Sequence, residues 1–241
     1  MDNLFVRKIK INRENIENYD VYPFNIPLIA NFKELKLNKP VTFIVGENGS
    51  GKSTLIESIA VALGLNPEGG SQNLNFSTFD SHSELHNFIK LEKGIKRPST
   101  KYFLRAESFY NVATETDKIP DALDAIGGTS LHKRSHGESF IQLIENRFYN
   151  NGLYLLDEPE SALSPTRQMQ FLALVDDLVK HDCQFIICTH SPIILSYPNA
   201  EIYQINEGSI ELTEYKNTEL FNIYKSFLQN PERTLNILLD E

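Results

Sequence analysis

The sequence predicts an α/β fold with a mostly parallel central sheet, flanking helices and an antiparallel β region near the N-terminus. Three short apolar runs are typical of strands buried on both faces: Val41–Val45, LYLLD at 153–157 and QFIICT at 184–189. Helical periodicity follows the first run and separates the other two. Strands that alternate with helices in this way indicate a layered α/β domain.

The N-terminal third should supply the antiparallel strands and the first helix. FVRKIKI at 5–11 alternates between apolar and polar residues, and YPFNIPLI at 22–29 followed by KELKL at 33–37 suggests further strands joined by turns. After Val45 a glycine-rich turn leads into TLIESIAVALGL at 54–65, whose apolar positions recur at helical spacing. Another helix is predicted near Ser83–Leu91.

The C-terminal half continues the alternation. A helix is expected around Gln168–Lys180, between the two later buried strands. IYQI and SIELTEY should then pair as a hairpin across Asn206–Gly208. The tail Thr218–Leu239 has a helical pattern with a break at Pro231.

Composition fits one folded domain. The chain has 241 residues, 41% hydrophobic and 23% charged, and we expect a single domain over 1–241 with a helical subregion inserted at about 66–150. No run approaches the ~18 consecutive apolar residues of a membrane span, and MDNLFVRKIKIN lacks the apolar core of a secretory signal. A strand between Cys183 and Cys188 would hold them roughly 16 Å apart, beyond disulfide reach. We therefore expect a cytoplasmic protein with free thiols and no direct membrane insertion.

The charge balance bears on the class of partner. Lys and Arg number 23 against 32 acidic residues, and the net charge of -9 works against non-specific binding to nucleic acid or anionic membranes. The basic stretch Lys90–Lys101 is a local exception. It lacks interleaved aromatic residues, so a solvated loop is the favoured interpretation, and nucleic-acid binding stays an open alternative.

A phosphate-binding loop is the most specific motif in the chain. GENGSGKS at 46–53 matches G-x-x-x-x-G-K-[ST] and lies between a predicted buried strand and a predicted helix. Its glycines would let backbone N–H groups wrap phosphate oxygens, Lys52 would bridge the outer phosphates, and the Ser53 hydroxyl would bind Mg²⁺. We expect a nucleoside triphosphate to contact the following residues: Gly46, Asn48, Gly49, Gly51, Lys52, Ser53 and Thr54.

Two acids and a histidine follow the later buried strands. Asp157 and Glu158 end one strand and His190 ends the next, so all three should meet the phosphate loop at the carboxyl edge of a parallel sheet. Asp157 is suited to hold Mg²⁺ through water, and Glu158 is suited to act as general base on an attacking water. The turn at Pro159 would let both acids reach the site, where His190 and Lys52 would act on the outer phosphate.

The order of these motifs resembles the ATP-binding-cassette (ABC) ATPase family. GENGSGKST resembles its Walker A motif, YLLDEPE its Walker B motif with the following glutamate, SALS at 161–164 its D-loop, and THSP its switch histidine. RSHGES at 134–139 is similar to the LSGGQ signature, with Ser135 and Gly137 retained. The resemblance implies a head-to-tail dimer in which ATP lies between Walker A of one subunit and Ser135 and Gly137 of the other. A signature that begins the predicted helix SFIQLIENRF agrees with this, because a helix N-terminus binds anions.

Several departures point away from transport cassettes. His136 and Glu138 replace the usual glycine and glutamine of the signature, and Ser164 stands where the D-loop aspartate is usual. Glu107 occupies the place of the Q-loop glutamine that links nucleotide to a partner subunit. The chain thus looks closer to the soluble SMC-like, predicted AAA-family ATPases. Tyr22 and Phe24 are candidates for stacking on adenine, with core packing as the alternative for both.

The leading hypothesis is a Mg²⁺-dependent ATPase that dimerises around two ATP molecules and acts as a clamp or switch, with an unidentified protein partner. A subunit of an ABC membrane transporter is the second reading, weakened by Glu107 and RSHGES. A DNA repair or defence ATPase is the third, opposed by the net charge. A small-molecule kinase is the fourth, and no acceptor site for it is identified.

Overall fold

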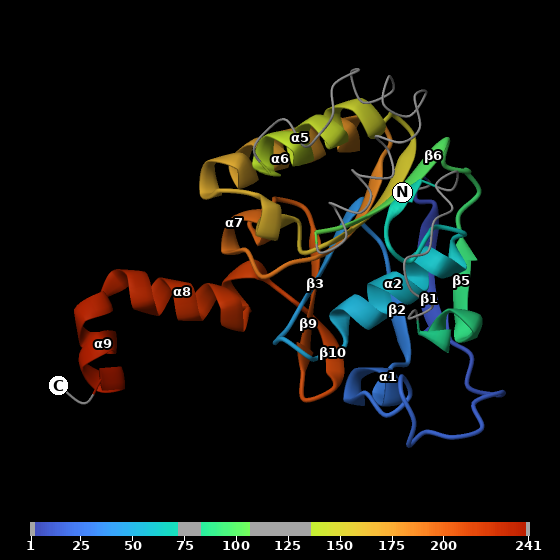
Figure 1. Cartoon of the computed structure of the whole chain (residues 1–241), viewed down its shortest axis with the longest axis horizontal. Coiled ribbons are helices and arrows are strands. Elements are labelled where there is room, and N and C mark those ends of the chain that lie inside the picture. The colour runs from blue at the N-terminus through green and yellow to red at the C-terminus, as the bar shows by residue number, and fades with distance from the viewer. Residues whose placement is uncertain (1–2, 72–82, 107–135, 240–241) are drawn as a thin grey trace.

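A seven-stranded sheet forms the centre of the molecule in the computed structural model, which describes residues 3–71, 83–106 and 136–239 (Figure 1). Its strand order is β10-β9-β3-β8-β7-β6-β4, in which β9, β3, β8, β7 and β6 run parallel. Antiparallel strands β10 and β4 close the two edges. The strands span Val41–Val45 (β3), Gly70–Ser71 (β4), Thr100–Arg105 (β6), Gly152–Asp157 (β7), Gln184–Cys188 (β8), Glu201–Asn206 (β9) and Ser209–Thr213 (β10).

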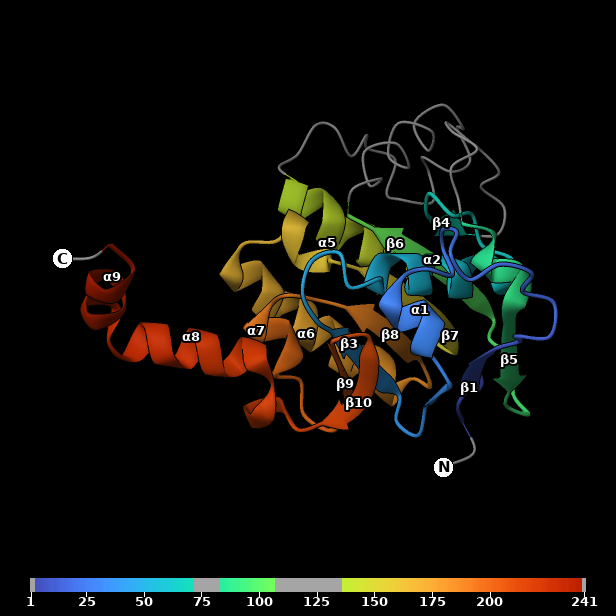
Figure 2. The ribbon, with the colours of Figure 1, turned by 90° about the horizontal axis from the view of Figure 1, so that it is seen from below.

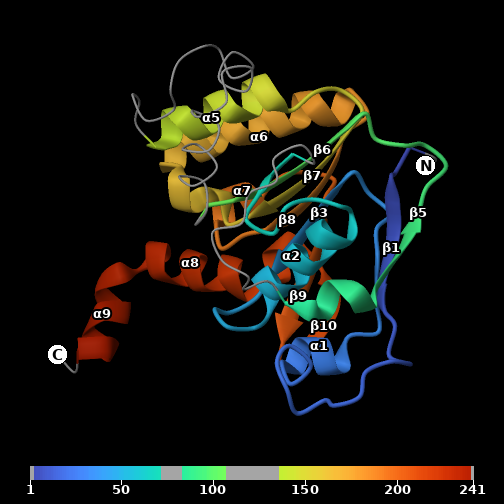
Figure 3. The same ribbon diagram turned by 45° about the vertical axis from the view of Figure 1, so that its right-hand side comes forward.

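Helices cover both faces of this sheet, which explains the continuous apolar runs in β3, β7 and β8. Side chains on one face, such as Phe43 and Phe185, pack with α5 (His136–Arg147) and α6 (Pro165–Lys180). The alternate residues, such as Ile44, pack with α2 (Lys52–Ala62) on the other face. Figures 1 and 3 show the α5–α6 pair and α2 on opposite sides of the sheet. The predicted α/β fold with a mostly parallel sheet is confirmed.

The predicted antiparallel region is a separate sheet of three strands. It has the order β2-β1-β5, formed by Val6–Ile11 (β1), Glu34–Lys36 (β2) and Ile89–Lys93 (β5), and it stands beside the central sheet in Figure 3. Gln184 of β8 joins the two sheets: its buried Oε1 accepts hydrogen bonds from the N–H groups of Phe5 (2.9 Å) and Val6 (3.0 Å), and its Nε2 donates to Val6 O (2.8 Å). One side chain thereby satisfies three backbone groups at the start of β1.

Two local predictions are wrong, and a third is right only in part. Residues 22–29 do not form a strand, because Pro27 begins the short helix α1 (Pro27–Asn31), a position where proline's missing N–H costs nothing. The helix expected near Ser83–Leu91 is only a 3₁₀ turn, η1 (Glu84–Phe88), which runs directly into β5. The solvated loop predicted at Lys90–Lys101 is confirmed only for residues 94–99, since Lys90 and Lys93 belong to β5, which pairs with β1, and Lys101 belongs to β6.

The C-terminal segment agrees with its prediction. The β9–β10 hairpin forms across Asn206–Gly208, and after the 3₁₀ turn η4 (Tyr215–Asn217) the chain continues as α8 (Glu219–Gln229) and α9 (Pro231–Leu239). Neither helix has a buried residue, and both extend away from the sheets in Figure 2. Among the described helices, none is both long and apolar enough to cross a membrane.

The two remaining predictions concern the cysteines and the domain organisation. Cys183 and Cys188 are free and buried. The assignment of 1–241 as one domain with an inserted subregion at 66–150 stays a prediction. Within that stretch, β6 pairs in parallel with β7, so part of it belongs to the central sheet.

Candidate functional site

The phosphate loop connects β3 to α2 and is pressed closely against its surroundings. Gly51, the residue before α2, has a φ of 97°, a left-handed conformation that favours glycine. A Cβ on Gly51 would lie 2.8 Å from Ile26 Cγ2, and one on Gly46 would lie 2.9 Å from Ile205 Cβ. Both glycines are therefore required by close packing against α1 and the β9–β10 hairpin.

Lys52 lies inside the loop that it would serve. Its side chain is buried, and its Nζ donates hydrogen bonds to Gly46 O (2.8 Å) and Glu47 O (2.7 Å). Burial lowers the pKa of Lys52 from its ordinary value, and the nearby Cys188, Glu158 and Asp157 oppose that shift. An ammonium bonded only to neutral carbonyls retains its charge for an incoming anion.

A pair of oxygen ligands meets at the end of β7. The Ser53 hydroxyl donates to Asp157 Oδ1 over 3.3 Å, and Asp157 is buried. Arg105, at the end of the neighbouring β6, places its Nε 3.7 Å from Asp157 Oδ2 and its Nη1 2.8 Å from Glu57 Oε2. A hydroxyl and a carboxylate are hard donors that fit Mg²⁺, which takes few protein ligands and keeps several waters.

Glu158 turns out of the strand by a left-handed backbone conformation. Its φ is 52° and its ψ 53°, and its N–H donates to Cys188 O of β8 (3.0 Å). A turn at Pro159 is predicted to bring both acids to the site, but the left-handed backbone conformation lies one residue earlier, at Glu158 itself. The resulting carboxylate places Oε1 3.5 Å from His190 Nε2.

His190 follows β8, two residues beyond its last strand residue. Burial and the charge of Lys52 lower the pKa of His190 from its ordinary value, and the Glu158 carboxylate opposes that shift. His190 Nε2 and, in the phosphate loop, Ser50 Oγ are buried without a hydrogen-bond partner among the described residues. Buried polar atoms of this kind are expected where a ligand supplies the partner.

Glu160 is a residue of this site that the sequence analysis missed. It lies in the 3₁₀ turn η3 (Pro159–Ala162) and accepts hydrogen bonds from Thr189 Oγ1 (2.8 Å) and from the backbone N–H of His190. Burial raises the pKa of Glu160 from its ordinary value, and both hydrogen bonds oppose that shift. The available signal was an acidic residue on each side of Pro159, which is equally typical of a helix start.

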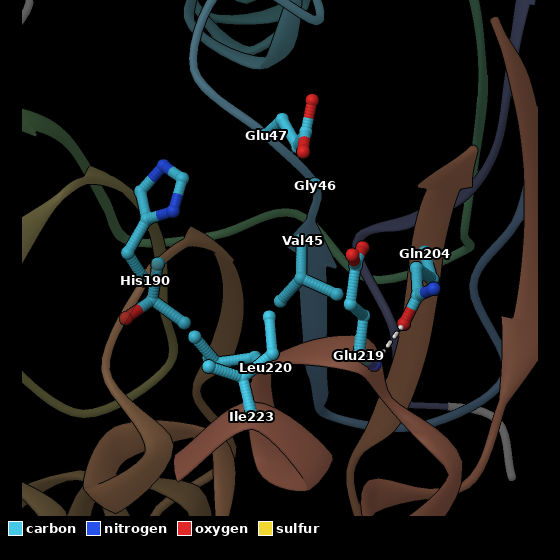
Figure 4. A pocket seen from close by; sticks show the side chains of 9 residues that line it. Val45, Gly46, Glu47, His190, Gln204, Glu219, Leu220 and Ile223 are labelled. Atoms are coloured by element: carbon cyan, nitrogen blue, oxygen red, sulfur yellow. Dashed lines mark hydrogen bonds between the residues drawn. The ribbon is translucent and has the colours of Figure 1, made fainter. Parts of the chain in front are cut away.

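Two cavities adjoin the phosphate loop. One of about 180 Å³ lies between the end of β3, His190 and the first turn of α8, where Glu219 donates its N–H to Gln204 Oε1 (3.0 Å; Figure 4). The other, of about 730 Å³, lies between the loop, α1 and the β9–β10 hairpin. The second cavity is lined in part by Asn48, Gly49, Ser50, Pro27 and Gly208.

The structure brings together five of the predicted residues: Lys52, Ser53, Asp157, Glu158 and His190. Gly46, Asn48, Gly49 and Gly51 lie in the loop, and Thr54 lies in the first turn of α2.

The predicted signature is described only in part. Gly137 lies in the first turn of α5, where a Cβ would be 3.1 Å from Ala162 O of η3, while Ser135 and Glu107 lie outside the described residues. Phe24 is buried with its ring edge-on to Phe88 at 5.0 Å, which favours core packing over adenine stacking. Tyr22 is 58% exposed.

Comparison with known proteins agrees with this geometry. Residues 11–172 match the AAA domain family, and no curated protein matches the chain. Among solved structures, cbiO1 from Clostridium perfringens, part of the ABC transporter complex cbiONQ, is similar with a TM-score of 0.50 and 18% identity over 99% of this chain and 100% of that one. The SMC head domain from Thermotoga maritima has a TM-score of 0.47 and 16% identity over 87% and 98%. The family match spans well over half of the sequence, and the likeness to cbiO1 shows the fold. The chain therefore belongs to the AAA domain family and has the fold of an ABC-type P-loop ATPase.

Proposed function

We propose that the protein binds ATP and hydrolyses it with Mg²⁺. The observation that carries this proposal is the convergence of Lys52, the Ser53–Asp157 pair and the Glu158–His190 pair at the carboxyl edge of β3, β7 and β8. Cation, oxygen ligands and a candidate base are the parts that phosphoryl transfer requires.

The phosphate loop and Lys52 bind the triphosphate. Lys52 exchanges its bonds to Gly46 O and Glu47 O for phosphate oxygens, while loop N–H groups contact the same oxygens. Ser53, with Asp157 acting through water, would hold Mg²⁺, which when bound offsets negative charge on the phosphates. Asp157 is kept in place by Arg105.

Glu158 acts as the general base. It takes one proton from a water as that water's oxygen bonds to the γ-phosphorus and the bond to the bridging oxygen of ADP breaks, releasing ADP and phosphate. His190 contacts the γ-phosphate from the neighbouring strand end. The 3.5 Å separation between Glu158 Oε1 and His190 Nε2 lets both side chains reach one phosphoryl group.

Hydrolysis takes place in a head-to-tail homodimer that holds two ATP molecules and acts as a clamp or switch in the cytoplasm. In this arrangement Ser135 and Gly137 of the second subunit would close over the nucleotide, and Glu107 would contact it. Packing of the α5 start on η3 supports the arrangement, because it couples the signature to the segment that follows Glu158.

Glu158→Gln tests this proposal by its molar mass in light scattering, with and without ATP and Mg²⁺. Removal of the base should trap bound ATP, so the mass should double only when ATP is present, and phosphate release should fall by at least about 100-fold. Glu211→Gln, an exposed position on β10, controls for loss of one acidic charge. A variant that holds ATP but stays monomeric would contradict the dimer, and unchanged phosphate release would contradict the role of Glu158.

Co-purification of a membrane protein would instead favour the transporter alternative, and salt-sensitive DNA binding would favour the DNA-associated alternative.

A further inference from the structure

We propose that Glu160 is a positioning residue for the ATPase reaction: its carboxylate holds the backbone that carries His190 in register with Glu158. This inference rests on the proposed function, since it concerns the same phosphoryl transfer. It adds a second acid of the DEPE segment to the machinery, with a role different from that of Glu158.

The two oxygens of Glu160 hold two consecutive residues after β8. Oε2 accepts from Thr189 Oγ1 at 2.8 Å, and Oε1 accepts from the backbone N–H of His190. Glu160 lies only two residues after Glu158. The base and the histidine are therefore connected through a short, doubly bonded link as well as through the β7–β8 ladder.

Thr189 extends the hydrogen bonds of Glu160 to the next residues of the segment 189–191. Its hydroxyl accepts from the N–H of Ser191 (3.0 Å) and donates its single proton to Glu160. The Ser191 hydroxyl donates to Gln168 Oε1 (2.5 Å), and Gln168 Nε2 donates to Leu163 O (3.0 Å). The hydrogen bonds thus form a closed circuit from η3 through residues 189–191 to α6 and back to the end of η3.

Each oxygen of Glu160 faces a hydrogen-bond donor. One donor is the backbone N–H of His190, which cannot accept, and the other is the Thr189 hydroxyl, which has one of its two lone pairs occupied by Ser191. A glutamine has nearly the same shape but must turn its NH₂ group toward one of these donors. Loss of one bond would free either the Thr189 side chain or the His190 backbone, and a shift of about 1 Å at a reacting group costs up to about 100-fold in rate.

The test compares Glu160→Gln with wild type in ATP hydrolysis, with Glu211→Gln as the charge-matched control. We expect kcat to fall about 10- to 100-fold, while KM and the Kd for ATP, measured by direct titration, change less than about threefold because the phosphate loop is intact. The His190 backbone amide proton should also move upfield in the NMR spectrum, since it loses a charge-assisted hydrogen bond. Thr189→Val should reproduce part of the kcat loss, and Thr189→Ser, which keeps the hydroxyl, should restore it.

The outcomes separate this inference from the proposed function. Wild-type hydrolysis together with a folded Glu160→Gln variant of unchanged kcat and amide shift overturns the role of Glu160 alone. A wild type that hydrolyses no ATP overturns both. Should Glu160→Gln fail to fold, the Thr189→Val and Thr189→Ser pair decides, because equal kcat in these two variants contradicts the link through Glu160.

Discussion

Charged side chains of the three-stranded sheet form ion pairs across neighbouring strands. At the carboxyl edge of the seven-stranded sheet, by contrast, the ammonium of Lys52 hydrogen-bonds only to neutral groups. Glu34 lies within 3.7 Å of the amines of Lys8, Lys10 and Lys36, which help to lower its pKa from its ordinary value. At the other edge, Lys52 meets only neutral carbonyls, and His190 Nε2 has no hydrogen-bond partner among the described residues.

The charged side chains of the three-stranded sheet neutralise one another, whereas those at the carboxyl edge of the central sheet are available to act on a bound ligand. The cross-strand pairs are partly exposed to solvent, where ion pairs contribute little and side chains are neutralised by their neighbours. Lys52 and Asp157 at the central edge are buried, so their charges act more strongly on whatever binds there than they would in water. A basic stretch in the sequence, such as the lysines of β1 and β5, is for this reason a weaker functional signal than one buried lysine.

Lys52→Ala should have the largest effect on activity. Loss of the buried ammonium removes the main cation facing the triphosphate, and ATP hydrolysis should fall by at least about 100-fold. Lys36→Ala, in the three-stranded sheet, should hydrolyse ATP at the wild-type rate. Steady-state phosphate release measures both variants. An equal loss of ATP hydrolysis in the two would contradict the functional difference between the two sheets.

Phe185→Ala should cause the largest loss of stability. Its ring is fully buried and packs on Tyr154, with centroids 5.3 Å apart, so the free energy of unfolding should fall by about 3–5 kcal/mol. Leu91→Ala, in β5, removes a partly buried side chain and should cost about 1–2 kcal/mol. Urea unfolding compares the two. A larger loss at Leu91 would mean that the three-stranded sheet, and not the central one, dominates the core.

Gln184→Leu tests the connection between the sheets. Three backbone groups at the start of β1 would lose their buried partner, which should lower the free energy of unfolding by about 2–3 kcal/mol. Amide hydrogen exchange at Phe5 and Val6 should accelerate before exchange in β3 does. Gln170→Leu, at an exposed position of α6, is the control, and identical exchange in both variants would contradict the role of Gln184.

Glu34→Gln should have the smallest effect. Its three lysine neighbours are partly exposed, so the thermal midpoint should stay within error of wild type in a scan at moderate salt. A clear drop in the midpoint would show that the charge network of the three-stranded sheet stabilises the fold, and would remove the distinction between the two sheets.

Sequence patterns predicted the parts of the fold that local rules determine. Val41–Val45 and QFIICT were recognised as strands because burial on both faces leaves an unbroken apolar run. The meeting of Asp157 with His190 followed from parallel strands, whose carboxyl ends share an edge. The same reasoning brought the phosphate loop to that edge.

What sequence patterns missed depends on distant partners. Ile89–Lys93 became a strand because it pairs with β1, about eighty residues earlier, and no local signal announces that pairing. Gln184 stood inside an apolar run with nothing to mark its bonds to Phe5 and Val6. Glu160 was missed for a similar reason, since its hydrogen-bond partners Thr189 and His190 directly follow β8.

The backbone of Glu158 has a consequence for how the chain can evolve. A φ of 52° is unfavourable for most residues because it brings Cβ close to a backbone carbonyl oxygen, whereas Gly or Asn adopts it at little cost. Selection for thermal stability alone would therefore replace Glu158, and that replacement would remove the proposed base. A glutamate with this backbone conformation trades stability for the proposed turnover, and thermostabilising engineering of this protein has to leave it in place.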